Sequence, residues 1–243
     1  MMSVRSSDRF ATTRWSVVMR SASSETADAS HALTELAQRY WYPVYAYVRR
    51  CGHAPAIAED ITRCFLGGLM QQFRDGARSH PQCHFRRFLL DQLNAFLGGD
   101  WREIVDNDST TELAAPGDLE ARNERDNAGA VSPEQAYERS FALEVVVRAL
   151  RRLHSEARQT GRLAMYEALE PHLANDPVAG EYEAIATQLQ TRPLALIVAL
   201  KRLRQRFREL VGQELADTVT SAEDLAAEQA MLHGVLSGMQ TRA

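Results

Sequence analysis

The chain of 243 residues has few cysteines and no long apolar run. Three cysteines are an odd and low count, which excludes a disulfide scaffold and favours reduced thiols in a cytoplasm. No apolar run approaches the ~18 residues that a transmembrane helix needs, and the N-terminal MMSVRSSDRFATTRW lacks the apolar core of a secretory signal. We therefore expect a cytoplasmic protein with no membrane partner.

The sequence also lacks the motifs of common enzyme classes. It has no P-loop, no G-x-S-x-G, no H-E-x-x-H and no dinucleotide-binding glycine fingerprint, so we expect no catalytic residue, no cofactor and no metal. The cysteine and histidine residues of the N-terminal half match no ordinary zinc-finger spacing. We expect buried structural cysteines there, with metal binding or redox sensing as the alternative. The residues concerned are Cys51, His53, Cys64, Cys83 and His84.

Lysine is almost absent: Lys201 is the single lysine of the chain, which contains 27 arginines. The net charge of −4 gives no overall sign of nucleic-acid binding. Acidic residues are nevertheless unevenly spread: residues 103–132 contain eight acids and two arginines, a net charge of −6, so the rest of the chain sums to +2. This stretch has no sustained apolar periodicity and predicts a solvated acidic linker between two halves of the chain.

Apolar residues recur at helical spacing on both sides of the linker, and no segment alternates convincingly as a strand does. Residues 31–50 carry the first apolar stripe, which we expect Pro43 to kink. Further stripes cover residues 61–73, 85–97 and 143–153. The sequence therefore predicts an all-α fold. The residues of the stripes are Leu33, Leu36, Tyr40, Val44, Val48, Ile61, Phe65, Leu69, Phe73, Phe85, Phe88, Leu89, Leu93, Phe96, Leu97, Leu143, Val146, Val147, Leu150 and Leu153.

Residues 181–210 have the pattern of a helix-turn-helix. Two apolar stripes are separated by the short break of residues 190–192, and Pro193 suits the first position of the second helix. Five positive charges follow within eight residues, which is typical of phosphate contact. The alternative is an ordinary helical hairpin with a solvated basic face. The stripes are Tyr182, Ile185, Ala186 and Leu189, then Leu196, Leu200, Leu203 and Phe207; the charges are Lys201, Arg202, Arg204, Arg206 and Arg208.

Several motifs in a fixed order resemble an extracytoplasmic-function (ECF) sigma factor of bacterial RNA polymerase. FATTRWSVVMRSA and LAQRYWYPVYAYVRRCGH are similar to the opening of sigma region 2. AEDITRCFLGGLMQQF resembles the helix that binds core polymerase, and FRRFLLDQLNAFLGGDWREI the part that melts and reads the −10 element. The block from PEQAYERSFALEVVVRALRRL to VALKRLRQRFRELVGQELADTV is similar to region 4, whose helix-turn-helix reads the −35 element.

The resemblance implies two small helical domains. It places a region 2-like domain at residues 8–102, the acidic linker at 103–132, a region 4-like domain at 133–218 and a helical C-terminal extension at 219–243. The implied partners are promoter DNA and core RNA polymerase, through its β′ coiled coil and its β flap. Capture of unstacked −10 bases falls to Arg86, Arg87, Asn94 and Trp101, and major-groove contact to Arg192, Ala195, Lys201 and Arg202.

The predicted core-binding helix departs from the family pattern DAED-L-x-Q-[ED]. Glu59 and Asp60 remain, but Ile57 replaces the leading acid, Arg63 the glutamine and Cys64 the following acid. This face changes by three charge units where it would meet a basic coiled coil, so the unmodified chain should bind core polymerase poorly. The predicted core-binding residues are Glu59, Asp60, Thr62, Arg63 and Cys64.

Thr62 occupies the middle of this depleted face. A phosphate there would add about −1.5 to −2 charges and nearly restore the deficit. The chain resembles the ECF branch that a partner Ser/Thr kinase activates, so we expect Thr62 to be the phosphorylated residue; the alternative is that Thr62 is an ordinary surface residue of the helix.

The DNA-binding regions depart from the family as well. Acidic residues follow Trp101, where relatives have a basic run. Gln190, Arg192 and Ile197 stand where relatives have a turn glycine, an N-cap serine and a lysine, which shifts or weakens −35 reading. Two other functions stay open: a degenerate sigma-like phosphoprotein module that binds a kinase or regulator without initiating transcription, and a free helix-turn-helix repressor.

Overall fold

The computed structural model describes residues 27–74, 85–107, 115, 117–219 and 221–240. Over these residues the chain is helical and contains no strand, which confirms the predicted all-α fold. Two compact units divide the chain: Val145–Glu214 forms one, and the described residues up to Glu144, with those from Leu215 onward, form the other. None of the described helices is long and apolar enough to cross a membrane.

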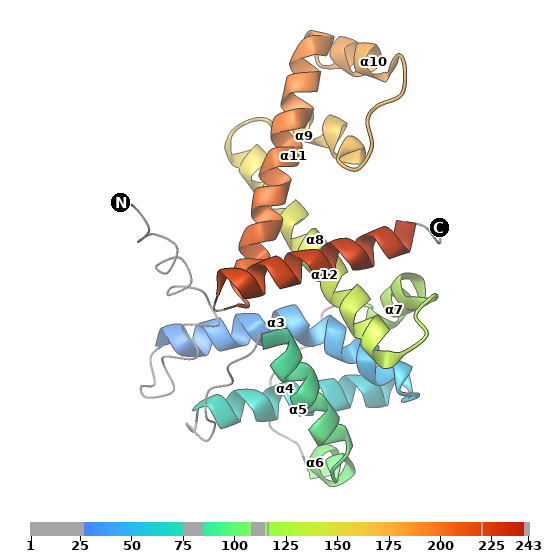
Figure 1. The fold of residues 1–243 in the computed structure, drawn as a ribbon, viewed down its shortest axis with the longest axis vertical. Helices are drawn as coiled ribbons and strands as arrows, with labels where there is room; N and C mark the ends of the chain where they lie inside the picture. The colour runs from blue at the N-terminus through green and yellow to red at the C-terminus, as the bar shows by residue number, and fades with distance from the viewer. Residues whose placement is uncertain (1–26, 75–84, 108–114, 116, 220, 241–243) are drawn as a thin grey trace. The chain divides into compact units, whose positions relative to one another are not determined.

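The first unit contains the N-terminal helices and the C-terminal helix. Pro43 lies inside α3 without ending it, and the aromatic side chains of this helix near Pro43 are buried in the core. The ring of Tyr40 packs against Phe85 at 5.0 Å and against Phe141 at 5.4 Å between centroids. The elements are α3 (Ala27–Arg50), α4 (Pro55–Arg74), α5 (Phe85–Leu97), α6 (Trp101–Asn107), α7 (Leu119–Asn127), the start of α8 (Pro133–Gln159) and α12 (Ala222–Gln240) (Figure 1).

The expectation that residues 103–132 form a solvated tether is wrong for much of this stretch. Asp118 caps α7 by accepting a hydrogen bond from the Ala121 backbone N–H at 3.1 Å. Glu120 of α7 then accepts hydrogen bonds from the Tyr45 hydroxyl at 2.5 Å and from Arg49 Nε at 2.7 Å. Charged residues of the acidic stretch therefore attach α7 to α3.

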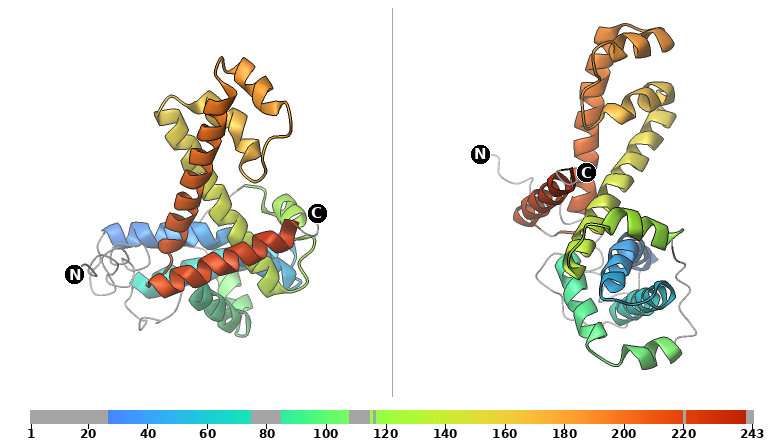
Figure 2. Two further views of the ribbon diagram at one scale, coloured as in Figure 1. Left: turned by 45° about the horizontal axis from the view of Figure 1, so that its top comes forward. Right: turned by 90° about the vertical axis from the view of Figure 1, so that its right-hand side faces the viewer.

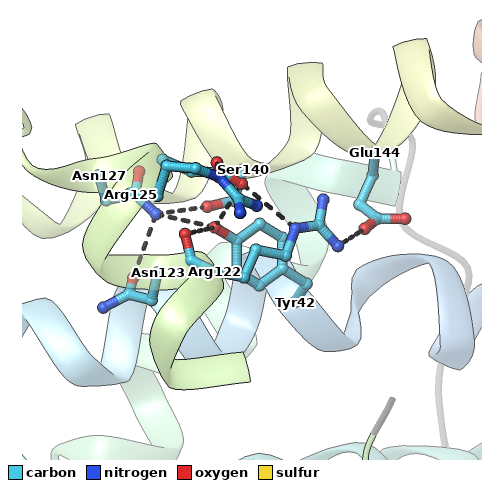
Figure 3. Close-up of polar contacts among 8 residues, drawn as sticks. Tyr42, Arg122, Asn123, Arg125, Asn127, Ser140 and Glu144 are labelled. Atoms are coloured by element: carbon cyan, nitrogen blue, oxygen red, sulfur yellow. Dashed lines mark hydrogen bonds and ion pairs between the residues drawn. The ribbon is translucent and has the colours of Figure 1, made fainter. Parts of the chain in front are cut away.

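A polar cluster at Tyr42 fixes the other end of α7. The Tyr42 hydroxyl donates to Asp126 Oδ2 at 3.0 Å, and the guanidinium of Arg122 lies over the Tyr42 ring at 3.8 Å. Arg122 also pairs with Glu144 of α8. Asn127 and Ser140 join the same cluster, so that α3, α7 and α8 meet there (Figure 3).

The second unit contains the end of α8, α9 (Leu163–Leu169), the 3₁₀ turn η1 (Glu170–His172), α10 (Glu181–Gln188) and α11 (Pro193–Ala216). Two apolar clusters hold it together. Leu153 of α8, Tyr166 of α9 and Leu210 of α11 centre one cluster, and Leu169 and Leu196 belong to the other, beneath α10. Figure 2 shows α10 beside the N-terminal end of α11.

The domain limits differ from the predicted ones. The second unit begins at Val145, inside α8, and ends at Glu214, inside α11, instead of spanning 133–218. Residues 221–240 belong to the first unit and are not a separate extension. The long helices α8 and α11 each contribute residues to both units. Because the limits of the units fall inside continuous helices, no break in the apolar pattern of the sequence marks them.

The buried tyrosines make stability sensitive to alkaline pH. Burial raises the pKa of Tyr47 to about 12 and raises the pKa values of Tyr42, Tyr45 and Tyr137 above the usual value near 10. These phenols stay neutral in the folded chain while they ionise in the unfolded chain. Their contribution to stability is complete below pH 10 and is lost as the pH rises above it, by up to about 1.4 kcal/mol per pH unit for each tyrosine.

We therefore expect the free energy of unfolding, measured by urea titration, to be flat near pH 8 and to fall between pH 10 and 11. The chain has a single lysine, so lysine titration contributes little to the change, and arginine does not titrate in this range. Tyr42→Phe should reduce the slope. A profile that is level up to pH 11 would contradict the buried, neutral state of these phenols.

Candidate nucleic-acid interface

The two helices predicted on either side of residues 190–192 are present. The first helix, α10, ends at Gln188, and the second helix, α11, begins at Pro193, the residue predicted for its first position. Between them the Thr191 backbone N–H donates to the Ala186 carbonyl at 2.9 Å, which closes the turn. At the start of α11 the Arg192 carbonyl accepts a hydrogen bond from the Ala195 N–H, also at 2.9 Å.

Gln190 adopts a backbone conformation that favours glycine. Its φ is +50°, the one positive value among the non-glycine residues that the structure describes. A side chain in this left-handed region costs roughly 1–2 kcal/mol, which glycine avoids. This explains why a glycine is expected at this turn position and shows that Gln190 fits it at a cost.

The inner faces of α9, α10 and α11 form a small core. Leu196 and Leu200 of α11 are buried against Leu169 of α9 and Ala186 of α10. Tyr182, Ile185 and Leu189 pack around them, as their helical spacing predicted. This core fixes which residues of α11 point outward.

Three of the four predicted contact residues lie on α11, and the fourth, Arg192, directly precedes the helix. Arg192, Ala195, Lys201 and Arg202 are exposed. Sequence analysis missed their neighbours: Leu194 is 71% exposed, Ile197 46% and Val198 43%. The sign of this was the run PLALIVAL, which is too continuously apolar for one buried face of a helix.

The predicted basic cluster is smaller than its sequence suggests. Arg204 donates to the backbone carbonyls of Leu173 and His172 and pairs with Asp176 at 2.6 Å. Arg206 pairs with Glu156 at 2.7 Å, and these hydrogen bonds lower the pKa of the Glu156 carboxyl. Two of the five charges thus hold the second unit together, while Lys201, Arg202 and Arg208 remain exposed.

Arg86, predicted to contact −10 bases, is used inside the first unit. Its guanidinium pairs with Glu228 of α12 at 3.1 Å and with Glu138 of α8 at 3.4 Å, and it lies 5.8 Å from the centre of the Phe141 ring. Glu228 is 2% exposed. The expectation of a DNA-facing Arg86 is therefore wrong, because a nearly buried carboxylate already holds its charge.

The other predicted −10 residues are more accessible. Arg87 is exposed on α5. Asn94 is exposed as well, although its Oδ1 accepts a hydrogen bond from the Tyr47 hydroxyl at 2.6 Å. Trp101 begins α6 and is partly exposed, with the His53 ring at 5.2 Å and the Arg102 guanidinium at 4.7 Å from its ring centre.

The predicted core-binding face lies on α4. Arg63 pairs with Asp60 at 2.8 Å and with Glu59 at 3.4 Å, so one guanidinium contacts both acids and offsets one of their two charges. Ile57 stands exposed one turn earlier. The Arg63 charge that was counted in the sequence deficit thus lies directly against Glu59 and Asp60.

Thr62 does not lie on this face. Its side chain is 0% exposed, and its hydroxyl donates to the Ala58 carbonyl at 2.7 Å. Cys64 is also buried. The assignment of both residues to an accessible core-binding face is wrong, because residues 61, 62, 64, 65 and 66 all belong to the wide buried side of α4.

Two cysteines fall within the described residues. Cys64 is buried, as expected of a structural cysteine, whereas Cys51 is exposed at the end of α3. Cys83, His84 and the motif at residues 10–22 lie outside the described residues.

Comparison of the chain with protein-family models, with curated proteins and with solved structures finds no match.

Gln190→Gly should stabilise the second unit by about 1 kcal/mol, because glycine removes the strain of a positive φ. The matched control is Ala184→Gly, which places the same residue in the exposed interior of α10 and should cost about 1 kcal/mol. Thermal unfolding of both variants measures the difference. Destabilisation by both glycines would show that the turn is not left-handed.

Glu228→Gln should lower the free energy of unfolding by about 2–3 kcal/mol, because it leaves Arg86 without its closest charge partner. Glu223→Gln makes the same change at an exposed position of α12 and should shift stability by less than about 0.5 kcal/mol. Equal effects in chemical denaturation would place Glu228 outside the core.

Proposed function

We propose that the chain is a promoter-specificity factor of the ECF sigma type, which directs transcription initiation while bound to core RNA polymerase. The observation that carries the proposal is the helix-turn-helix of α10 and α11. Its outer face presents Arg192, Lys201 and Arg202 on a rigid apolar core, which suits contact with duplex DNA.

The first unit supports the same proposal. Its α4 and α5 occupy the segments that the resemblance assigns to core binding and to the −10 element. Arg87 and Trp101 are the accessible cation and aromatic ring of this region, the side chains that bind unstacked bases. Arg86 has no part in the proposal, because it is a structural residue.

Core binding would use the side of α4 that carries Glu59 and Asp60. The β′ coiled coil expected as its partner is basic, and a β flap contact would fall to the second unit. Because Arg63 already pairs with both acids, the resting chain presents little net negative charge there. Weak binding of the unmodified chain follows from this pairing.

Control by a Ser/Thr kinase at Thr62 would require a change in the conformation of α4. A buried hydroxyl is closed to a kinase, so phosphorylation requires local opening of α4. A phosphate carrying nearly two charges cannot return to that site without a large desolvation cost. Phosphorylation would therefore hold α4 in a displaced conformation and leave the phosphate free to pair with basic residues of the polymerase.

The second candidate is a sigma-like interaction module that binds a kinase or regulator without initiating transcription. Two arginines favour it, because each pairs with a carboxylate of the chain itself. Arg63 lies on the predicted core-binding face, and Arg86 lies in the segment predicted to read the −10 element. The two candidates differ in whether the chain binds core polymerase at all.

Titration of labelled core polymerase with the full chain separates these candidates. Arg63→Gln should tighten binding by about fivefold to tenfold at low salt, because it releases Glu59 and Asp60 and removes one repelling cation. The gain should shrink at physiological salt.

The matched control is Arg50→Gln, which removes the same charge from the exposed end of α3 and should leave the affinity unchanged. Equal tightening by both variants would assign the effect to net charge and not to the α4 face. The proposed function fails if core polymerase binds none of three proteins: the wild-type chain, the Arg63→Gln variant and the chain phosphorylated at Thr62.

A further inference from the structure

The first two turns of α11 contain no side chain that can form a hydrogen bond. Residues 193–200 read PLALIVAL. Leu196 and Leu200 are buried in the core, whereas Leu194, Ile197 and Val198 face solvent. Three large aliphatic side chains thus share one exposed surface at the end of the helix that a helix-turn-helix brings to its ligand.

Positive charge surrounds this aliphatic surface. Arg192 precedes it, and Lys201 and Arg202 follow it by one turn; all three are exposed. No acidic residue lies between positions 184 and 208 of the chain. The surface is therefore complementary to a polyanion that also offers apolar groups, and duplex DNA has both features.

The major groove of duplex DNA limits what this surface can read. Base edges there present hydrogen-bond donors and acceptors, which aliphatic side chains cannot pair. The exception is the 5-methyl group of thymine, which is recognised by apolar contact. In the docking geometry of a helix-turn-helix, the N-terminal residues of the second helix are those that meet base edges.

We propose that α11 recognises duplex DNA by packing Leu194, Ile197 and Val198 against thymine methyl groups, while Arg192, Lys201 and Arg202 contact the flanking phosphates. This inference rests on the proposed function only in that the duplex is the upstream element of a promoter. It makes these three aliphatic residues the determinants of specificity, and it predicts upstream elements rich in A·T pairs.

The contribution of each thymine is modest. Burying one methyl-sized group corresponds to about a fourfold gain in affinity. The three cations set most of the affinity and its salt dependence, without regard to sequence. Recognition is therefore expected to need two or more correctly spaced thymines.

Selection from a randomised duplex library and thymine-to-uracil exchange test the inference. Duplexes are selected with the full chain bound to core polymerase and, separately, with the full chain alone. Each thymine of the selected site is then replaced by uracil. Uracil differs only by the missing methyl group, so a contacted position should lose about threefold to fivefold in affinity. Uracil outside the site should have no effect.

Two variants connect this loss to α11. Ile197→Ala should weaken binding to the thymine duplex and abolish the response to uracil at one position, because the methyl group then has no partner. Ile197→Lys should also abolish that response, while it raises affinity at low salt and steepens the salt dependence. Ile197 is exposed, so both variants keep the fold. Val178→Ala, at a 68% exposed aliphatic residue outside α11, is the control and should behave as the wild type.

Each contrary result has a distinct meaning. If the chain with polymerase initiates transcription but uracil exchange changes nothing, the inference is overturned and the proposed function stands. If Ile197→Ala lowers affinity for core polymerase instead of the response to uracil, the surface binds protein, which also overturns the inference. If the chain binds no duplex with or without polymerase, thymine recognition is excluded.

Discussion

One largely buried guanidinium connects three helices of the first unit. Arg86 of α5 meets Glu228 of α12, Glu138 of α8 and the ring of Phe141, and its own carbonyl accepts a hydrogen bond from Tyr137 at 3.1 Å. A charge that is largely removed from water needs partners that stay in place. Helices from three distant parts of the chain meet around it, and its pairing with Glu228 attaches α12 to α5 within this unit. A charge fixed in this way is no longer available to a ligand.

Helical periodicity was sufficient to predict the elements that carry an apolar stripe. The all-α fold, the helices α3, α4 and α5, and the turn between α10 and α11 follow from the spacing of residues such as Leu36, Tyr40 and Leu196. The helix α7 has no such stripe, because LEARNERDN attaches by ion pairs and tyrosine hydroxyls. Long-range polar partners leave no periodic trace in a sequence, so neither this helix nor the pairing of Arg86 was predictable.

The candidate site shows the same limit. The sequence predicted that the contact residues at the start of α11 are accessible, and all four are exposed: Arg192, Ala195, Lys201 and Arg202. The sequence also placed Thr62 outward, in the middle of the face that is depleted of acids. On α4, however, the buried side is wide enough to include both Ile61 and Thr62. The apolar residues at positions 64–66 contained this information, because a helix buried over so much of its circumference has little surface left for a partner.

A promoter-specificity factor should give core polymerase a start-site preference of its own. The most direct measurement maps RNA 5′ ends after transcription of fragments of the encoding genome by core polymerase alone, with the chain, and with the chain phosphorylated at Thr62. We expect discrete start sites that require both proteins and that are preceded by A·T-rich upstream elements. RNA from these sites should be more abundant after phosphorylation. Identical 5′ ends in all three reactions, with the chain bound to polymerase, would contradict this expectation.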